Sequence, residues 1–99
     1  MTHRLAPEAE TDLDEIWYYI ARQSSSVEVA DRVVDSITKR FSVIAAWPQA
    51  GRPRDADLRP GVRSFAAGEY VIIYRIESAH VVILRVLRGN RDIESIIRH

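Results

Sequence analysis

The chain contains no cysteine, and it lacks other features that mark large classes of enzymes and metalloproteins. Without cysteine, neither a disulfide nor a thiolate metal site can form. The three histidines, at positions 3, 80 and 99, share no metal-ligand spacing, and the four glycines do not gather in a phosphate-binding loop. No nucleophile elbow surrounds any serine. We therefore predict no metal site and no cofactor.

Long apolar runs are also absent. No run approaches the roughly 18 residues that span a membrane, and the first ten residues lack the apolar stretch of a secretory signal. We therefore expect a cytoplasmic protein that does not contact membranes. The chain has 99 residues, of which 46% are hydrophobic and 28% charged, which suits one domain spanning residues 1–99 around one core.

Charge is unevenly placed, although the net charge is zero. Residues 1–50 carry five basic and eight acidic side chains, whereas residues 51–99 carry nine and six. Thirteen of the fourteen basic residues are arginine, whose planar fork suits carboxylates and phosphates. The second half is therefore the candidate region for binding an anion or an acidic partner.

Two amphipathic helices are expected in the first half of the chain. The first covers residues 7–22, because proline suits a first helical position and acidic residues follow in the first turn. We interpret those acidic residues, including Asp12, as a capped, solvated face. A Ser-x-x-Glu capping box from Ser25 to Glu28 starts the second helix, which ends at Trp47 because a proline follows. The short link predicts an antiparallel helical hairpin.

The second half is expected to form an antiparallel meander of three strands. Short β-branched and aromatic runs occur at residues 62–66, 71–74 and 81–84. A further strand at residues 2–6 and a short helix at residues 92–99 are also expected. The fold class is α+β, in the order β-α-α-β-β-β with a last helix, and the helical hairpin packs on a small antiparallel sheet.

The long arginine-bearing connection at residues 48–61 admits two interpretations, a solvated surface loop or a loop that binds an anion or partner. The register of the last two strands can be predicted more closely. A turn centred on residues 78–79 pairs residues whose numbers sum to 157, which places Arg75 near Val82 and Arg85 near Ile72. Both arginines interrupt apolar faces, so we expect their stems to pack on the sheet. Their heads are expected to pair with carboxylates nearby: Glu69, Glu77 or Asp92.

The most specific signal in the sequence is a motif near the end of the last predicted strand. The chain carries Leu84-Arg85-Val86-Leu87-Arg88-Gly89-Asn90-Arg91-Asp92, preceded by Arg63-x-Phe65-x-x-Gly68-x-Tyr70-x-Ile72-x-Tyr74-Arg75. With Leu13-x-x-Ile16-Trp17-x-Tyr19 and Trp47-Pro48-x-x-Gly51, this pattern resembles the ParE branch of the RelE/ParE toxin superfamily over nearly the whole chain. One departure is Arg88, where that family often has histidine.

The resemblance implies the toxin of a bacterial type II toxin–antitoxin module, of the kind associated with plasmid stabilisation. A cognate, ParD-like antitoxin would hold the toxin in a hetero-oligomer and neutralise it. Two activities are implied by the superfamily. The ParE branch inhibits DNA gyrase and arrests growth, whereas the RelE branch cleaves mRNA in the ribosome.

Two positions favour the gyrase inhibitor over the ribonuclease. Val71 and Ile97 stand where the resemblance places a catalytic arginine and an aromatic acid in the RelE branch. Phosphoryl transfer needs charge stabilisation and a proton donor, which these apolar residues do not supply. We therefore predict no catalytic residues. If the protein is instead a ribosome-dependent endoribonuclease, its candidate residues are Arg63, Arg91 and His99.

Two binding surfaces are predicted. The resemblance and the basic exit of the last strand place target binding at Arg85, Arg88, Asn90 and Arg91. We place antitoxin binding at Trp17, Tyr18, Arg63 and Arg75, with the antitoxin lying across the helical hairpin and the open sheet edge. We expect the toxin alone not to bind nucleic acid sequence-specifically.

Overall fold

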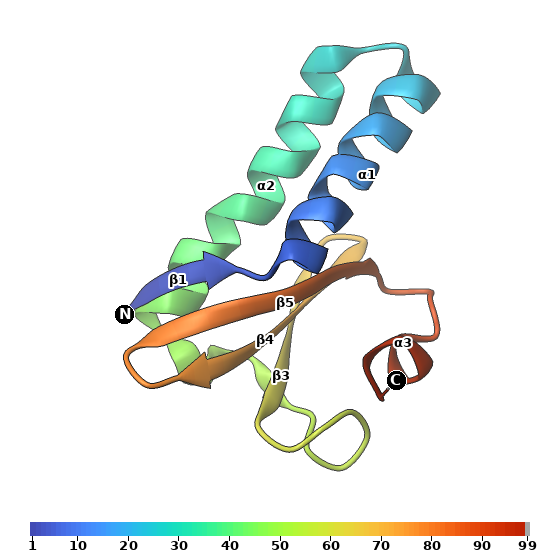
Figure 1. Cartoon of the computed structure of the whole chain (residues 1–99). Coiled ribbons are helices and arrows are strands. Elements are labelled where there is room, and N and C mark those ends of the chain that lie inside the picture. The colour runs from blue at the N-terminus through green and yellow to red at the C-terminus, as the bar shows by residue number, and fades with distance from the viewer. Residues whose placement is uncertain (99) are drawn as a thin grey trace.

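Two long helices and a five-stranded sheet make up most of the chain (Figure 1). The computed structural model describes residues 1–98. The predicted α+β class and the order of its main elements are confirmed. In chain order the elements are β1 (Thr2–Leu5), α1 (Pro7–Ser24), α2 (Val27–Ala46), the 3-10 helix η1 (Pro48–Ala50), β2 (Arg52–Pro53), β3 (Val62–Ala67), β4 (Tyr70–Glu77), β5 (His80–Arg88) and α3 (Ile93–Arg98).

The strands lie in the order β1-β5-β4-β3-β2. The predicted antiparallel meander is confirmed for β3, β4 and β5. The prediction of an all-antiparallel sheet is wrong for β1, which pairs with β5 in parallel. A parallel pair needs a long crossover connection, and here the α1–α2 hairpin and the first strands of the meander lie between β1 and β5 in the chain. Strand β2 was not predicted. It has only two residues, which pair with Ser64 and Arg63 of β3.

The helical hairpin is confirmed, but its turn is shorter than predicted. Helix α1 continues to Ser24, and Ser25 ends it with a left-handed φ of 54°. The hydroxyl of Ser26 accepts a hydrogen bond from Val29 N (3.2 Å), so the predicted cap at Ser25 is wrong by one residue. Helix α2 ends before Trp47, as the following proline predicts.

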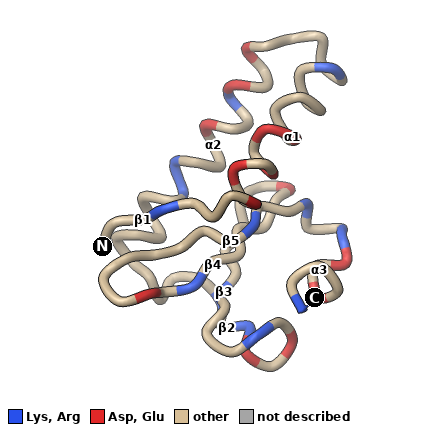
Figure 2. Tube along the Cα trace, in the orientation of Figure 1, with Lys and Arg blue, Asp and Glu red and all other residues tan. Residues whose placement is uncertain are grey.

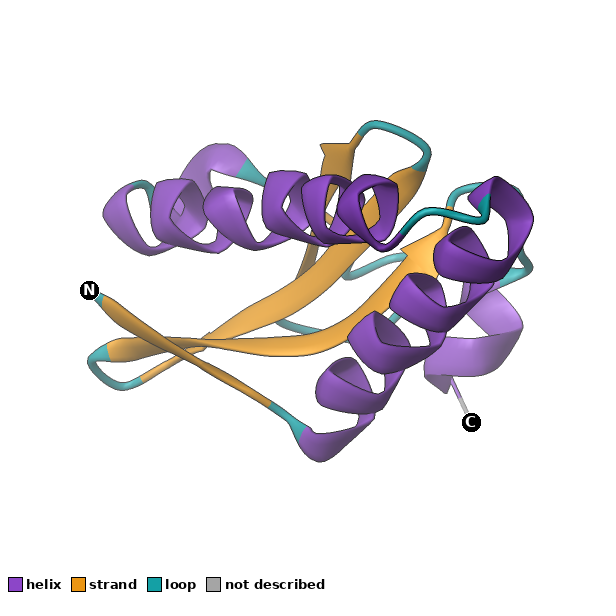
Figure 3. Cartoon of the chain, turned by 90° about the horizontal axis from the view of Figure 1, so that it is seen from above, coloured by secondary structure: helices purple, strands orange, loops and turns teal. Residues whose placement is uncertain are grey.

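Both faces of the sheet are covered. From above, α1 and α2 lie on one face (Figure 3), and they enclose the larger core with Ile72, Tyr74 and Ile83. On the other face, α3 and the β2–β3 connection enclose a smaller core that includes Leu58 and Ile97. The short α3 is therefore stabilised by docking rather than by its own length.

The register of β4 and β5 is predicted correctly near their turn and wrongly beyond it. Arg75 faces Val82, as the turn geometry predicts. A β-bulge then shifts the pairing between Ile73 and Tyr74, so that Arg85 faces Ile73 rather than the predicted Ile72. The extra residue in β5 reverses the faces of everything that follows.

Among residues 1–98, no helix has the length and apolarity needed to cross a membrane. The same residues contain no group of three metal-ligating side chains.

Candidate functional site

The chain leaves β5 through a tight turn at residues 88–91, which we call the β5 exit. Gly89 N donates to Glu69 O (2.9 Å), which ties the exit to the β3–β4 connection. Arg91 N donates to Arg88 O (3.1 Å), which closes the turn. Acidic residues lie along α1, and basic residues lie on β5 and on its connection to α3 (Figure 2). The exit therefore presents its side chains from a fixed backbone.

Arg88 is held at the exit by two contacts. Its guanidinium carbon lies 5.4 Å from the centre of the Tyr19 ring, which is a cation–π geometry. Its Nη2 atom lies 3.4 Å from the Glu69 carboxylate. Tyr19 was not among the predicted site residues. Its place in the first-helix motif was the signal that could have identified it.

Asn90 and Arg91 are exposed, and within residues 1–98 neither side chain makes a hydrogen bond or ion pair. Arg91 also lines a groove of about 220 Å³ beside α1, with Ile16, Tyr19 and Leu87 among its other walls. The exit therefore combines exposed charge with apolar surface, which suits a protein partner.

Arg85 does not share this exposure, because Asp12 of α1 holds it. Its Nε and Nη2 atoms donate to the two Asp12 carboxylate oxygens at 2.8 and 2.9 Å. Asp12 Oδ2 also accepts from Val86 N (2.9 Å). The predicted partners of Arg85 (Glu69, Glu77 or Asp92) are therefore wrong.

The prediction that Asp12 lies on a solvated face is also wrong, since only 5% of Asp12 is exposed. Asp12 stands three residues after Ala9 and four before Ile16, on the apolar stripe of α1. This position was the sequence signal for its burial. A buried carboxylate requires charged or hydrogen-bonding partners, and Arg85 with Val86 N supplies them.

The residues predicted to bind an antitoxin do not form one cluster. Trp17 and Tyr18 pack together on α1 with ring centres 5.4 Å apart, and Trp17 Nε1 donates to Asp31 of α2 (2.8 Å). Tyr18 is 64% exposed. Trp17 and Tyr18 therefore form an aromatic patch on the hairpin.

The two arginines of that set lie on opposite faces of the sheet. Their partners, Tyr74 for Arg63 and Val62 for Arg75, are in successive pairs of the same ladder. Arg63 donates to Gly51 O (2.7 Å). Arg75 Nε donates to Glu77 (2.6 Å), which confirms the predicted pairing and is the main cause that lowers the pKa of that carboxyl.

The structure does not bring the ribonuclease candidates together. Arg63 pairs with Tyr74, whereas the exit that carries Arg91 begins opposite Tyr70. Four residues of strand separate those levels by about 13 Å. His99 lies outside the described residues.

The two positions that the resemblance aligns with catalytic groups of the ribonuclease branch, Val71 and Ile97, are apolar contacts in the smaller core. Ile97 is buried there, and Val71 packs against it from β4. Neither side chain is available to a phosphate.

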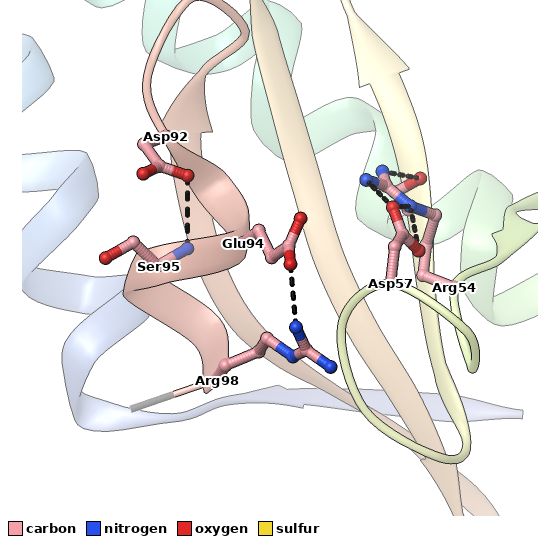
Figure 4. Close-up of polar contacts among 7 residues, drawn as sticks. Arg54, Asp57, Asp92, Glu94, Ser95 and Arg98 are labelled. Atoms are coloured by element: carbon pink, nitrogen blue, oxygen red, sulfur yellow. Dashed lines mark hydrogen bonds and ion pairs between the residues drawn. The ribbon is translucent and has the colours of Figure 1, made fainter.

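The connection before β3 is internally bonded (Figure 4). Arg54 donates to Asp57 and to Ser64, with its closest contact to Asp57 at 2.6 Å. The same view shows Glu94 paired with Arg98 on α3. Arg54 is therefore a structural residue, while Arg52 and Arg59 remain exposed on this connection.

The chain is similar to known proteins over most of its length. Residues 4–93 match the family described as "ParE toxin of type II toxin-antitoxin system, parDE". The chain is 39% identical over 90 residues to Toxin ParE1 of Caulobacter vibrioides, covering 91% of each protein. It is 35% identical to Toxin ParE3 of the same organism, covering 83% of this chain and 80% of the relative.

A solved structure described as "Chromosomal ParDE TA system from P. aeruginosa" has a similar fold. Its TM-score is 0.78 at 23% identity, and the match covers 89% of this chain and 95% of that one.

Proposed function

The chain belongs to the ParE toxin family of type II toxin–antitoxin systems, and on that premise we propose that it inhibits DNA gyrase, arrests growth and is neutralised by a cognate antitoxin. The observation that carries the proposal is the β5 exit. There Asn90 and Arg91 are exposed beside an apolar groove, on a backbone fixed by two hydrogen bonds. A rigid turn with mixed charge and apolar surface suits recognition of a protein.

The alternative activity, ribosome-dependent cleavage of mRNA, has less support. Its basic candidates Arg63 and Arg91 lie at different levels of the sheet, and Arg63 already donates to Gly51 O. Val71 and Ile97 are packed in the smaller core. A proton donor and a charge-stabilising group would both have to come from elsewhere.

Antitoxin binding is proposed for the hairpin and the adjoining sheet. The aromatic patch of Trp17 and Tyr18 offers apolar area on an acidic helix pair, and the sheet offers arginines. A wrapping partner could pair with both signs of charge. In this arrangement Tyr18 supplies contact area, and Arg63 and Arg75 supply hydrogen-bond donors once a partner competes for them.

The direct test measures purified toxin in a gyrase supercoiling assay and, in parallel, in a translation extract with labelled mRNA. Wild type should inhibit supercoiling and leave the mRNA intact. Arg91→Ala should weaken inhibition by about tenfold or more, the effect of losing an interface hot spot. Arg22→Ala is the matched control, because Arg22 is an exposed arginine in the last turn of α1. Cleaved mRNA with unaffected gyrase would overturn the proposal in favour of the ribonuclease.

A further inference from the structure

The β-bulge in β5 decides on which face of the sheet the exit arginines emerge. Tyr74 of β4 faces Ile83, but its neighbour Ile73 faces Arg85, so Leu84 has no partner of its own. Adding one residue to one strand of a ladder reverses the side-chain alternation beyond it. The bulge lies four residues before Arg88.

The reversal is visible in which core each buried residue of β5 joins. Before the bulge, Val81 and Ile83 belong to the core beneath the helical hairpin. After it, Val86 belongs to that core, and Leu87 belongs to the core beneath α3. Arg88 therefore emerges on the hairpin side, where it lies over the Tyr19 ring.

Without the bulge, the pairing set by the turn would continue unchanged. Arg85 would then follow Ile83 onto the hairpin face and enter the larger core, where a charge is costly. Leu87 would move to the hairpin side, and Arg88 would move to the α3 side, away from Tyr19. The bulge thus avoids burying one arginine and orients the other.

Asp12 makes the contacts that the bulge requires. At the bulge, the Arg85 guanidinium and Val86 N both donate to the Asp12 carboxylate of α1, at 2.8–2.9 Å. Asp12 is the buried acidic residue of the part of the chain that the structure describes. Strand β1 cannot supply these acceptors, because its pairing with β5 ends at Ile83.

We propose that Asp12 is a positioning residue for target binding. Through Arg85 and Val86 N it holds the bulge, and the bulge holds Arg88 and the exit on the hairpin side of the sheet. This inference rests on the proposed function, in which the exit contacts gyrase. Arg85 then supports the exit and does not touch the target itself.

The test compares Asp12→Asn with Asp14→Asn. Asp14 is an exposed aspartate on the same helix and serves as the matched control. Asparagine keeps the size of the side chain and one oxygen for Val86 N, but it loses the charge that pairs with Arg85. We expect Asp12→Asn to inhibit gyrase about tenfold less and to bind the antitoxin with unchanged affinity. Its Val86 amide should exchange with solvent about tenfold faster than in wild type. Asp14→Asn should match wild type in gyrase inhibition and in exchange of the Val86 amide.

A double-mutant cycle separates positioning from general loss of structure. If Asp12 acts through the exit, Asp12→Asn should cause no further loss of inhibition in a background that carries both Arg88→Ala and Arg91→Ala. Equal losses in both backgrounds would overturn the inference. Should Asp12→Asn fail to fold, Arg85→Lys, which keeps the charge but loses the fork, takes its place with the same expectations.

Two different results separate the role of Asp12 from the identity of the target. Asp12→Asn that inhibits gyrase as well as wild type overturns only the role of Asp12. A wild-type toxin without effect on gyrase overturns the proposed target as well.

Discussion

Among single residues, Tyr74 is the most tightly constrained. Its side chain is fully buried in the larger core. The hydroxyl accepts from Gly51 N (2.8 Å) and donates to Pro48 O (2.7 Å), so it joins η1 to β4. A Cβ at position 51 would lie 2.3 Å from that hydroxyl, and only glycine fits there. The Trp47-Pro48-x-x-Gly51 motif thus has a physical reason in the ring of Tyr74.

Tyr74→Phe should destabilise the fold without changing the shape of the core. It leaves Gly51 N and Pro48 O without their partner, and unpaired buried groups cost about 1–3 kcal/mol. Urea unfolding should show a loss of this size. Tyr18→Phe, at an exposed tyrosine, is the control and should change stability by less than about 0.5 kcal/mol. Equal stability of Tyr74→Phe and wild type would contradict the assigned hydrogen bonds.

Stability should also fall at alkaline pH because of buried tyrosines. Burial is the main cause that raises the pKa of Tyr74 and of Tyr70 above the ordinary value of 10. The folded state then keeps protons that the unfolded state releases, so the stability present below pH 10 is lost as the pH rises toward the folded pKa. Unfolding measured between pH 9 and about pH 11 should show this slope. Tyr74→Phe should make the slope shallower, whereas an identical slope would contradict the assignment.

Among the elements, the turn between α1 and α2 contains two adjacent serines whose substitution should change stability in opposite directions. Ser25 adopts a left-handed conformation that glycine adopts without strain, so Ser25→Gly should stabilise the hairpin by up to about 1 kcal/mol. Ser26 caps α2, so Ser26→Ala should cost about 0.5–2 kcal/mol. Thermal unfolding of the two variants measures both changes. Effects of the same sign would refute this assignment of cap positions.

Helix α3 depends on its docking, so the smaller core can be tested separately. Ile97 is buried against this core, and Ile97→Ala should cost about 2–5 kcal/mol if the rest of the fold holds α3 in place, or release α3 if it does not. Growth arrest should weaken in either case, as it should when residues 92–99 are removed. Glu94→Gln loses only the exposed pair with Arg98 and should behave like wild type. Full toxicity after removal of α3 would place the target surface elsewhere.

These elements also show how much the sequence could reveal. The helices were predictable because their apolar period and their proline and serine boundaries are local signals. Strand β2 was not, because its two residues carry no period and depend on β3 for pairing. At the bulge, Arg85 and Val86 N bond to Asp12, which is more than 70 residues away in sequence. Exit residues 88–91 were found through the family motif. Tyr19 and Asp12 had sequence signals too, but their partners Arg88, Arg85 and Val86 follow only from the folded structure.

At the scale of the whole molecule, the proposed binding surfaces lie on different parts of the fold. Tyr18 is exposed on α1 and Arg91 is exposed in the exit that follows β5. The hairpin and the end of β5 are separate parts of the fold (Figure 1). Tyr19 lies between them, because it follows Tyr18 in the chain and contacts Arg88. An antitoxin on the hairpin therefore lies next to the target surface without having to cover it.

This separation predicts that the two activities can be removed independently. Tyr18→Ala removes an exposed ring and should weaken antitoxin binding by about tenfold, while gyrase inhibition stays at the wild-type level. Arg91→Ala should do the reverse. Calorimetric titration with the antitoxin and the supercoiling assay provide the two measurements. Antitoxin at 100 times its Kd should also stabilise the wild-type toxin by about 2.7 kcal/mol, with a smaller gain for Tyr18→Ala at the same concentration. If Arg91→Ala weakens both activities, the antitoxin reaches the exit and neutralises the toxin by covering it directly.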